Sequence, residues 1–196
     1  TDVYDAAIEA SLQWAIQHRI NDIQIDEAPA AIAIIGMGRY GGREVNFSSD
    51  ADVIIIYRPA EGADDDQANL FARKVQEDLR AILQGPTTFE PKIELDMDLR
   101  PEGKNGPLVR SYASCEEYYR SWASTWEHQA LLRARYAAGD ASLAEDFLMN
   151  IADPLRYPKI DLTETQIAEI RKLKARMEAE RLPRGVRRDR HLKLGK

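Results

Sequence analysis

Cysteine is almost absent from this sequence, which has only Cys115 among its 196 residues. One cysteine excludes an internal disulfide framework and is typical of a reducing compartment, so we expect a cytoplasmic protein. Long hydrophobic runs are also missing. No apolar stretch is long enough to cross a membrane, and the first residues do not read as a signal peptide, so we expect no membrane partner.

Basic residues are scarce over most of the chain and gather at its end. Residues 171–196 hold 11 of the 27 lysines and arginines and only 3 of the 33 acidic residues, a net charge of +8. The rest of the chain then has a net charge of −14, and the whole chain has a net charge of −6. A basic end can bind nucleic acid, but this one is mixed with leucine and valine, which favours a solvated helix face or a phosphate-facing surface. We expect no nucleic acid partner.

The central feature is a glycine-rich segment between two apolar runs, within residues 31–57. Both runs are rich in isoleucine and predict strands. The glycines between them suit a loop whose N–H groups approach phosphate oxygens. Asp50 and Asp52 open the second strand, and side chains two apart on a strand share a face. Two carboxylates beside such a loop predict a magnesium site.

The segment 36–41 also matches the G-x-G-x-x-G pattern of dinucleotide-binding folds. Only about ten residues separate the two predicted strands, and a parallel crossover with its helix needs roughly a dozen or more. The acidic residue expected about twenty positions further on is also missing. We therefore expect neighbouring antiparallel strands, with at most one short helical turn between them.

Residues 92–100 alternate between apolar and charged side chains, which predicts a half-buried strand. The charged face holds Glu94, Asp96, Asp98 and Arg100. Three carboxylates on one face repel one another unless a cation or an arginine lies among them. Two interpretations stay open at this point, a catalytic face and a solvent-exposed face.

A helix is predicted over residues 2–18, and another is predicted to end at about residue 84. From residue 111 the chain reads as mainly helical, with a helix over 126–138, another to about residue 150, and a last one over 164–181. Pro154 and Pro158 predict a linker before that last helix, and residues 184–196 read as a loop. We expect an α/β core over residues 1–110, followed by a helical segment over 111–196.

Three stretches together resemble the glutamine synthetase adenylyltransferases, large two-headed bacterial enzymes of the nucleotidyltransferase superfamily. They are GMGRYGGREVNFSSDADVIIIY at 36–57, LDMDLRPEGKNGPLV at 95–109 and WEHQALLRAR at 126–135. The resemblance implies a polymerase-beta-like mixed sheet with flanking helices. It also implies that the chain is part of a longer enzyme, because relatives continue beyond this point.

The resemblance implies a set of site residues. Asp50 and Asp52 match the Asp-x-Asp pair, and Asp96 is the expected third carboxylate, so these three become the expected catalytic and metal-binding residues. Asp98 departs from the family pattern and is the alternative third ligand. The expected nucleotide-binding residues are Gly41, Gly42, Ser49 and Arg100.

The implied activity is transfer of AMP from ATP to a tyrosine hydroxyl of glutamine synthetase, with release of pyrophosphate and two Mg²⁺ ions at the site. Such an enzyme regulates nitrogen assimilation. A PII-type signalling protein is an expected further partner, through the full-length enzyme. The stretch at 126–135 favours the C-terminal, AMP-attaching head. Two alternatives stay open: the head that removes AMP by phosphorolysis, and a non-catalytic module that only senses nucleotide.

Overall fold

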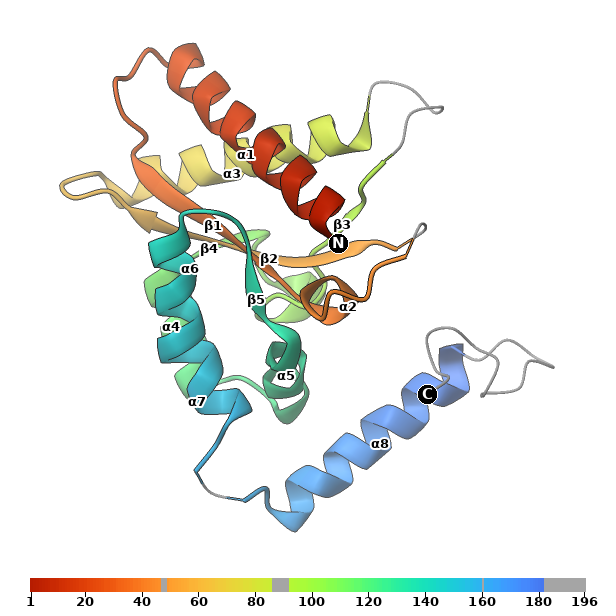
Figure 1. The fold of residues 1–196 in the computed structure, drawn as a ribbon. Helices are drawn as coiled ribbons and strands as arrows, with labels where there is room; N and C mark the ends of the chain where they lie inside the picture. The colour runs from red at the N-terminus through yellow and green to blue at the C-terminus, as the bar shows by residue number, and fades with distance from the viewer. Residues whose placement is uncertain (47–48, 86–91, 160, 182–196) are drawn as a thin grey trace.

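The computed structural model describes residues 1–46, 49–85, 92–159 and 161–181. Within these residues, a five-stranded mixed sheet has helices on both faces (Figure 1). The predicted α/β class is therefore confirmed. The loop expected at 184–196 lies outside the described residues.

The sheet is built around β1 (Ala30–Gly36) and β2 (Ala51–Pro59), which pair antiparallel along the whole length of β1. In the described part of the connection between them, the one regular element is the short helix α2 (Gly38–Gly41). This confirms the antiparallel arrangement that the short spacing predicts. On its other edge, β2 pairs in parallel with both β3 (Leu95–Asp96) and β4 (Val109–Ser111), while β5 (Arg135–Gly139) pairs antiparallel with β1.

The two central strands are buried on both faces because helices cover both sides of the sheet. Ile32 and Ile34 pack toward α1 (Asp2–Asp22) and α3 (Asp65–Gln84), whereas Ala33 and Ile35 pack toward the opposite layer. That second layer contains α4 (Tyr112–Ser121) and α6 (Ala141–Phe147). Continuous isoleucine runs are what a strand with two covered faces requires.

The helix predicted over 126–138 is wrong in its second half. The chain forms α5 (Thr125–Ala130) and a 3₁₀ turn, η2 (Leu131–Arg133), and then becomes the strand β5. Alanine-rich sequence favours helix locally, but pairing with the free edge of β1 satisfies backbone groups on both strands. Residues beyond 110 thus contribute to the sheet, and the domain boundary expected there stays a prediction.

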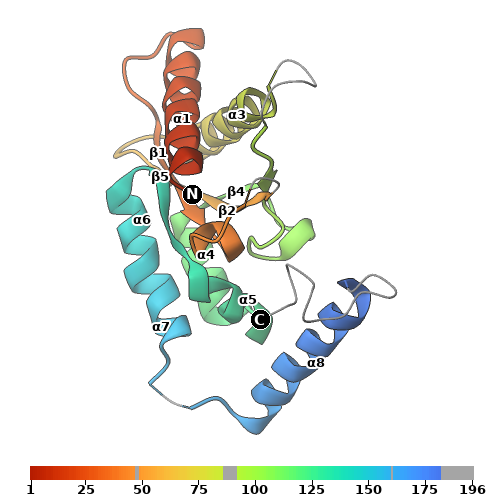
Figure 2. The ribbon, with the colours of Figure 1, turned by 45° about the vertical axis from the view of Figure 1, so that its right-hand side comes forward.

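The linker predicted from Pro154 and Pro158 begins later than expected, because the helical layer continues past Pro154, whereas Pro158 lies outside any helix. After α6 come a π-helical turn, η3 (Leu148–Ala152), and α7 (Asp153–Arg156), which has its proline in the first turn. Proline fits there because a first-turn N–H has no partner within the helix. Among the described residues, the last helix, α8 (Glu164–Arg181), stands away from the sheet and packs mainly against α5 (Figure 2). None of the helices in the described part of the chain is both long and apolar enough to span a bilayer.

Gly139 is expected to be far less tolerant of substitution than another glycine of similar backbone angle. Gly139 has φ +87 and Gly62 has φ +76, so alanine is strained at both. A Cβ on Gly139 would also overlap the Ile32 carbonyl oxygen, whereas Gly62 has open space around it. We expect Gly62→Ala to cost about 1 kcal/mol of unfolding free energy and Gly139→Ala more than about 3 kcal/mol. Urea denaturation measures both, and equal losses would contradict the packing role of Gly139.

Candidate active site

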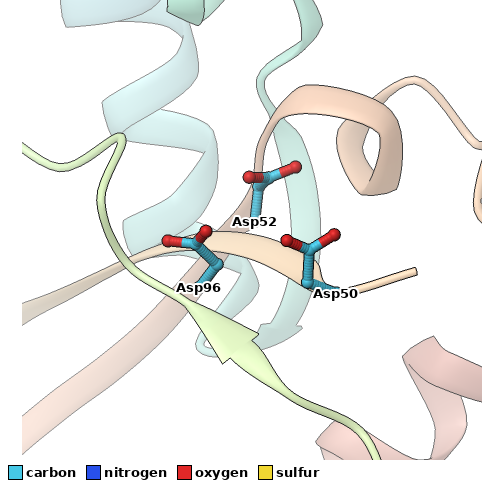
Figure 3. A group of neighbouring side chains, drawn as sticks. All are labelled: Asp50, Asp52 and Asp96. Atoms are coloured by element: carbon cyan, nitrogen blue, oxygen red, sulfur yellow. The ribbon is translucent and has the colours of Figure 1, made fainter. Parts of the chain in front are cut away.

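Three aspartates from two strands converge at one end of the sheet (Figure 3). Asp50 directly precedes β2 and Asp52 is its second residue, so both point to one face. The parallel register sets Asp96 of β3 opposite Asp52. One carboxylate oxygen from each of the three lies within 4.8 Å of the others. The structure therefore brings together the three carboxylates that the sequence singled out.

The environment of Asp52 disfavours its ionised form. Partial burial, followed by the charges of Asp50 and Asp96, raises the pKa of Asp52 to about 6. The backbone N–H and the side-chain charge of Arg39 act in the opposite direction but are weaker. A bound cation would relieve the repulsion among these three carboxylates, so the site is suited to bind one.

The short helix α2 lies against the aspartates because of Gly38, which the sequence analysis did not assign to the site. Gly38 has φ +51, and a Cβ there would overlap Oδ2 of Asp52. Only glycine permits this approach. The next residue, Arg39, then places a guanidinium nitrogen 3.4 Å from Oδ1 of Asp50. In the sequence, a glycine followed by an arginine a short distance before an Asp-x-Asp pair is the pattern that could have identified Gly38 and Arg39.

Gly41 and Gly42, expected to bind nucleotide, have contacts of a different kind. The N–H of Gly42 donates to the Gly38 carbonyl at 3.1 Å, and that of Gly41 to the carbonyl of Met37. A Cβ on Gly41 would overlap the carbonyl oxygen of Arg133, so this glycine lets α2 pack against η2. Their contact with phosphate stays a prediction.

Ser49 is buried in the turn that leads into Asp50. Its hydroxyl lies 2.9 Å from Oδ1 of Asn46 and accepts the backbone N–H of Asn46 at 3.0 Å. Its carbonyl accepts the hydroxyl of Tyr4. These bonds fix the backbone directly before the aspartate pair, and contact between Ser49 and phosphate stays a prediction.

Arg100 departs from the alternation expected over 92–100, because β3 spans only Leu95 and Asp96 and the chain then turns. Arg100 is buried, and its guanidinium donates to the carbonyls of Met97, Lys104 and Gly106. It thereby holds the loop after β3. The predicted alternation therefore fails at Arg100, which is buried, although its guanidinium still lies 3.9 Å from Oδ1 of Asp98. Its contact with phosphate stays a prediction.

Asp98 lies apart from the three converging aspartates. Its Oδ2 is 3.1 Å from Nζ of Lys104, and its backbone N–H donates to Oδ1 of Asp96 at 2.8 Å. The side chain of Asp98 therefore neutralises a lysine, while its backbone fixes the orientation of Asp96. This geometry favours Asp96 as the third carboxylate.

The aspartates open into a cleft of about 570 Å³. This is within the range of small-molecule sites. Besides Asp50 and Asp96, the cleft is lined by both acidic and basic side chains: Arg80, Glu94, Asp98, Arg100 and Lys104. The cleft therefore offers carboxylates that suit a metal ion, with basic side chains among them.

Mg²⁺ fits the donor set at this site. Magnesium prefers carboxylate oxygens and retains several waters, so a partly exposed trio of aspartates is an appropriate ligand set. Among the described residues, Asp50, Asp52 and Asp96 are the one group of three or more potential ligands that converge in this way. Cys115 offers no alternative chemistry, because burial raises its pKa to about 12.

Comparison with known proteins identifies the family. A model of the family described as glutamate-ammonia ligase adenylyltransferase matches residues 1–150. The chain belongs to this family. The resemblance inferred from the sequence motifs is thereby confirmed, and the three aspartates lie within the matched residues of the adenylyltransferase family.

Close relatives are bacterial proteins that carry the same two-part name. The bifunctional glutamine synthetase adenylyltransferase/adenylyl-removing enzyme of Bifidobacterium longum (strain DJO10A) is 79% identical over 196 residues, which cover 100% of this chain and 18% of that protein. The one of Mycobacterium tuberculosis (strain ATCC 25618 / H37Rv) is 48% identical over 196 residues, covering 100% of this chain and 19% of the relative. The chain thus spans about a fifth of the length of these adenylyltransferase relatives.

A solved structure, described as a toxin-antitoxin with AMP-PNP, is also similar. It shares 17% sequence identity and a TM-score of 0.26, covering 85% of this chain and 92% of its own. Membership of the adenylyltransferase family rests on the sequence matches.

Proposed function

We propose that this chain is the catalytic core that transfers AMP from ATP to a tyrosine hydroxyl of glutamine synthetase. The observation that supports it most directly is the convergence of Asp50, Asp52 and Asp96, with oxygens within 4.8 Å of one another, in a chain of the adenylyltransferase family. A module that only sensed nucleotide would have no need of three mutually repelling carboxylates at one point. Catalysis therefore explains the site better than sensing does.

In the proposed reaction the tyrosine oxygen attacks the α-phosphorus of ATP. A bond forms between that oxygen and phosphorus, the bond from the α-phosphorus to the bridging oxygen of the β-phosphate breaks, and pyrophosphate leaves. Asp96 is proposed to accept the proton of the hydroxyl. Bound magnesium, as two ions, would supply Lewis-acid stabilisation of the phosphoryl oxygens and of the attacking oxygen.

The chain's own residues are proposed to position these groups. Asp50 and Asp52 would hold both ions, and Asp96 would complete the second ion's ligands. The phosphate-binding side of the site is proposed to be formed by Gly41, Gly42 and Ser49. The two glycines keep α2 in place, and Ser49 keeps the turn before Asp50 in place. Arg100 would act there by holding the loop after β3, and Arg39 adds a cation beside Asp50.

The second candidate function is removal of AMP, which we propose would proceed by phosphorolysis. The names of the relatives include an adenylyl-removing activity beside the adenylyltransferase. The geometry of three aspartates serves either direction, because each forms one phosphorus–oxygen bond and breaks another. We propose attachment because residues 126–135 resemble the attaching head. A PII-type signalling protein that acts through the full-length enzyme stays a prediction.

The test follows AMP in both directions with the full-length protein. Unmodified glutamine synthetase, Mg²⁺ and ATP labelled at the α-phosphate are expected to give labelled synthetase and an equal amount of pyrophosphate. No label transfer by the wild-type protein would overturn the proposed function.

Direction is assigned with a double variant in the full-length protein. Asp50→Asn combined with Asp52→Asn is expected to abolish attachment, because both magnesium-binding carboxylates lose their charge. Removal of AMP from modified synthetase in the presence of phosphate should stay at the wild-type rate. The opposite pattern, with attachment retained and removal lost, would assign this chain to the removing activity.

A further inference from the structure

A second hollow adjoins the aspartate cleft and continues along α3. It has a volume of about 500 Å³ and lies between α3 and the segment that enters β4. Its lining includes Asn69, Arg73, Gln76, Glu77 and Arg80 of α3, together with residues 106–109. Arg80 and Leu108 line both hollows, so the two form one groove that ends at Asp50 and Asp96.

The length of this groove suits an extended polypeptide segment. From Asn69 to Arg80 the helix α3 rises about 16 Å, which corresponds to about five residues of extended chain. The opposite wall is the segment 106–109 that enters β4, a strand that packs beside α3 and, among the described residues, pairs only with β2. Leu108, at 40% exposure, offers an apolar contact midway along the groove.

Of the two arginines of the groove, Arg73 and Arg80, Arg80 is the one that also lines the aspartate cleft. Its side chain is exposed, and no hydrogen bond or ion pair joins it to another described residue. The other basic groups of the cleft already have partners within the loop after β3: Lys104 pairs with Asp98, and Arg100 binds backbone carbonyls. Arg80 thus lies where the groove enters the cleft, and its guanidinium is suited to a carboxylate.

We propose that the groove receives an extended acidic segment of the protein acceptor, with Arg80 binding a carboxylate beside the tyrosine that is modified. This inference rests on the proposed function and adds to it the residue that selects the acceptor. The groove aligns the segment between α3 and β4, so that the tyrosine reaches the aspartates at its end. Arg80 touches the acceptor but not the reacting atoms, so it acts on acceptor affinity.

The test compares Arg80→Glu with Arg171→Glu in the full-length protein. Arg171 is an exposed arginine on α8, remote from the groove, so the control makes the same change of charge elsewhere. The Michaelis constants for glutamine synthetase and for ATP are measured separately. Arg80→Glu is expected to raise the KM for the synthetase about tenfold or more, with the KM for ATP and kcat within about twofold of wild type. Arg171→Glu should match wild type in all three.

Ionic strength supplies a second readout. The KM of the wild-type protein for the synthetase should rise between 50 and 300 mM salt, and Arg80→Glu should flatten this dependence because the pair that salt screens is gone. A rise in the KM for ATP instead would assign Arg80 to the triphosphate and overturn the inference. An unchanged KM for the synthetase would overturn the inference while the proposed function stands. Wild-type protein without any transfer would overturn both.

Discussion

Asp52→Asn is expected to reduce AMP transfer by about three orders of magnitude or more while the fold stays intact. Asp52 is the central member of the trio, since it shares a face of β2 with Asp50 and is paired with Asp96 across the β2–β3 ladder. Loss of one such carboxylate is expected to weaken the proposed magnesium binding and the electrostatic stabilisation of the transition state, which is worth several kcal/mol. Single-turnover transfer at saturating magnesium measures the loss.

The same substitution is expected to stabilise the protein in metal-free buffer. Asp52 has a pKa of about 6 in the folded state, above its ordinary value of 3.8. A carboxyl whose pKa is raised by folding costs nothing where it is neutral in both states. Its cost grows from about pH 4 to pH 6 and is constant above about pH 7. Since Asp52 is partly exposed, we expect a gain of about 1–2 kcal/mol at pH 7.5 and none near pH 4.

The control for both measurements is Asp26→Asn. Asp26 is exposed in the loop after α1, so this change removes a carboxylate without touching the site. Its transfer rate and its unfolding free energy should match those of wild type at every pH. Wild-type transfer by Asp52→Asn, or a loss of stability at pH 7.5, would contradict the role assigned to Asp52.

The sequence predicts the site well where chemistry and local geometry coincide. Asp50 and Asp52 are recognisable because strand periodicity alone places them on one face. Their antiparallel neighbour follows from the short connection between the strands. Asp96 was harder to place, since a strand of two residues has no periodicity of its own. The family resemblance singled it out, and the structure then brought it beside Asp52.

Contacts between distant segments account for what the sequence does not predict. Arg100 follows the alternating pattern, but a turn after Asp96 buries it against backbone carbonyls. β5 reads as a helix because its alanines favour one, and only the free edge of β1 makes it a strand. Gly38 looks like any other loop glycine until α2 is packed against Asp52. Each of these depends on a partner that is remote in sequence or on a turn that propensity does not reveal.

Asp96→Asn is expected to be much more damaging than Asp98→Asn, although the two residues are neighbours on one segment. The carboxylate of Asp96 faces those of Asp50 and Asp52, whereas that of Asp98 faces Lys104. We expect Asp96→Asn to lose transfer by roughly a hundredfold or more, since both a proposed metal ligand and the proposed proton acceptor are removed. Asp98→Asn should stay within about threefold of wild type, because its backbone N–H still orients Asp96.

A readout apart from activity separates the two aspartates as magnesium ligands. In wild-type protein Mg²⁺ is expected to raise the melting temperature, because the ion binds the folded state and relieves the repulsion among the carboxylates. Asp96→Asn should diminish this magnesium-dependent shift, and Asp98→Asn should retain it. Because Asp98→Asn leaves Lys104 without its partner, a small loss of stability at all magnesium concentrations is expected for that variant. A larger loss of both transfer and magnesium response in Asp98→Asn would make Asp98 the third ligand, and the loop after β3 would then have to turn so that Lys104 releases it.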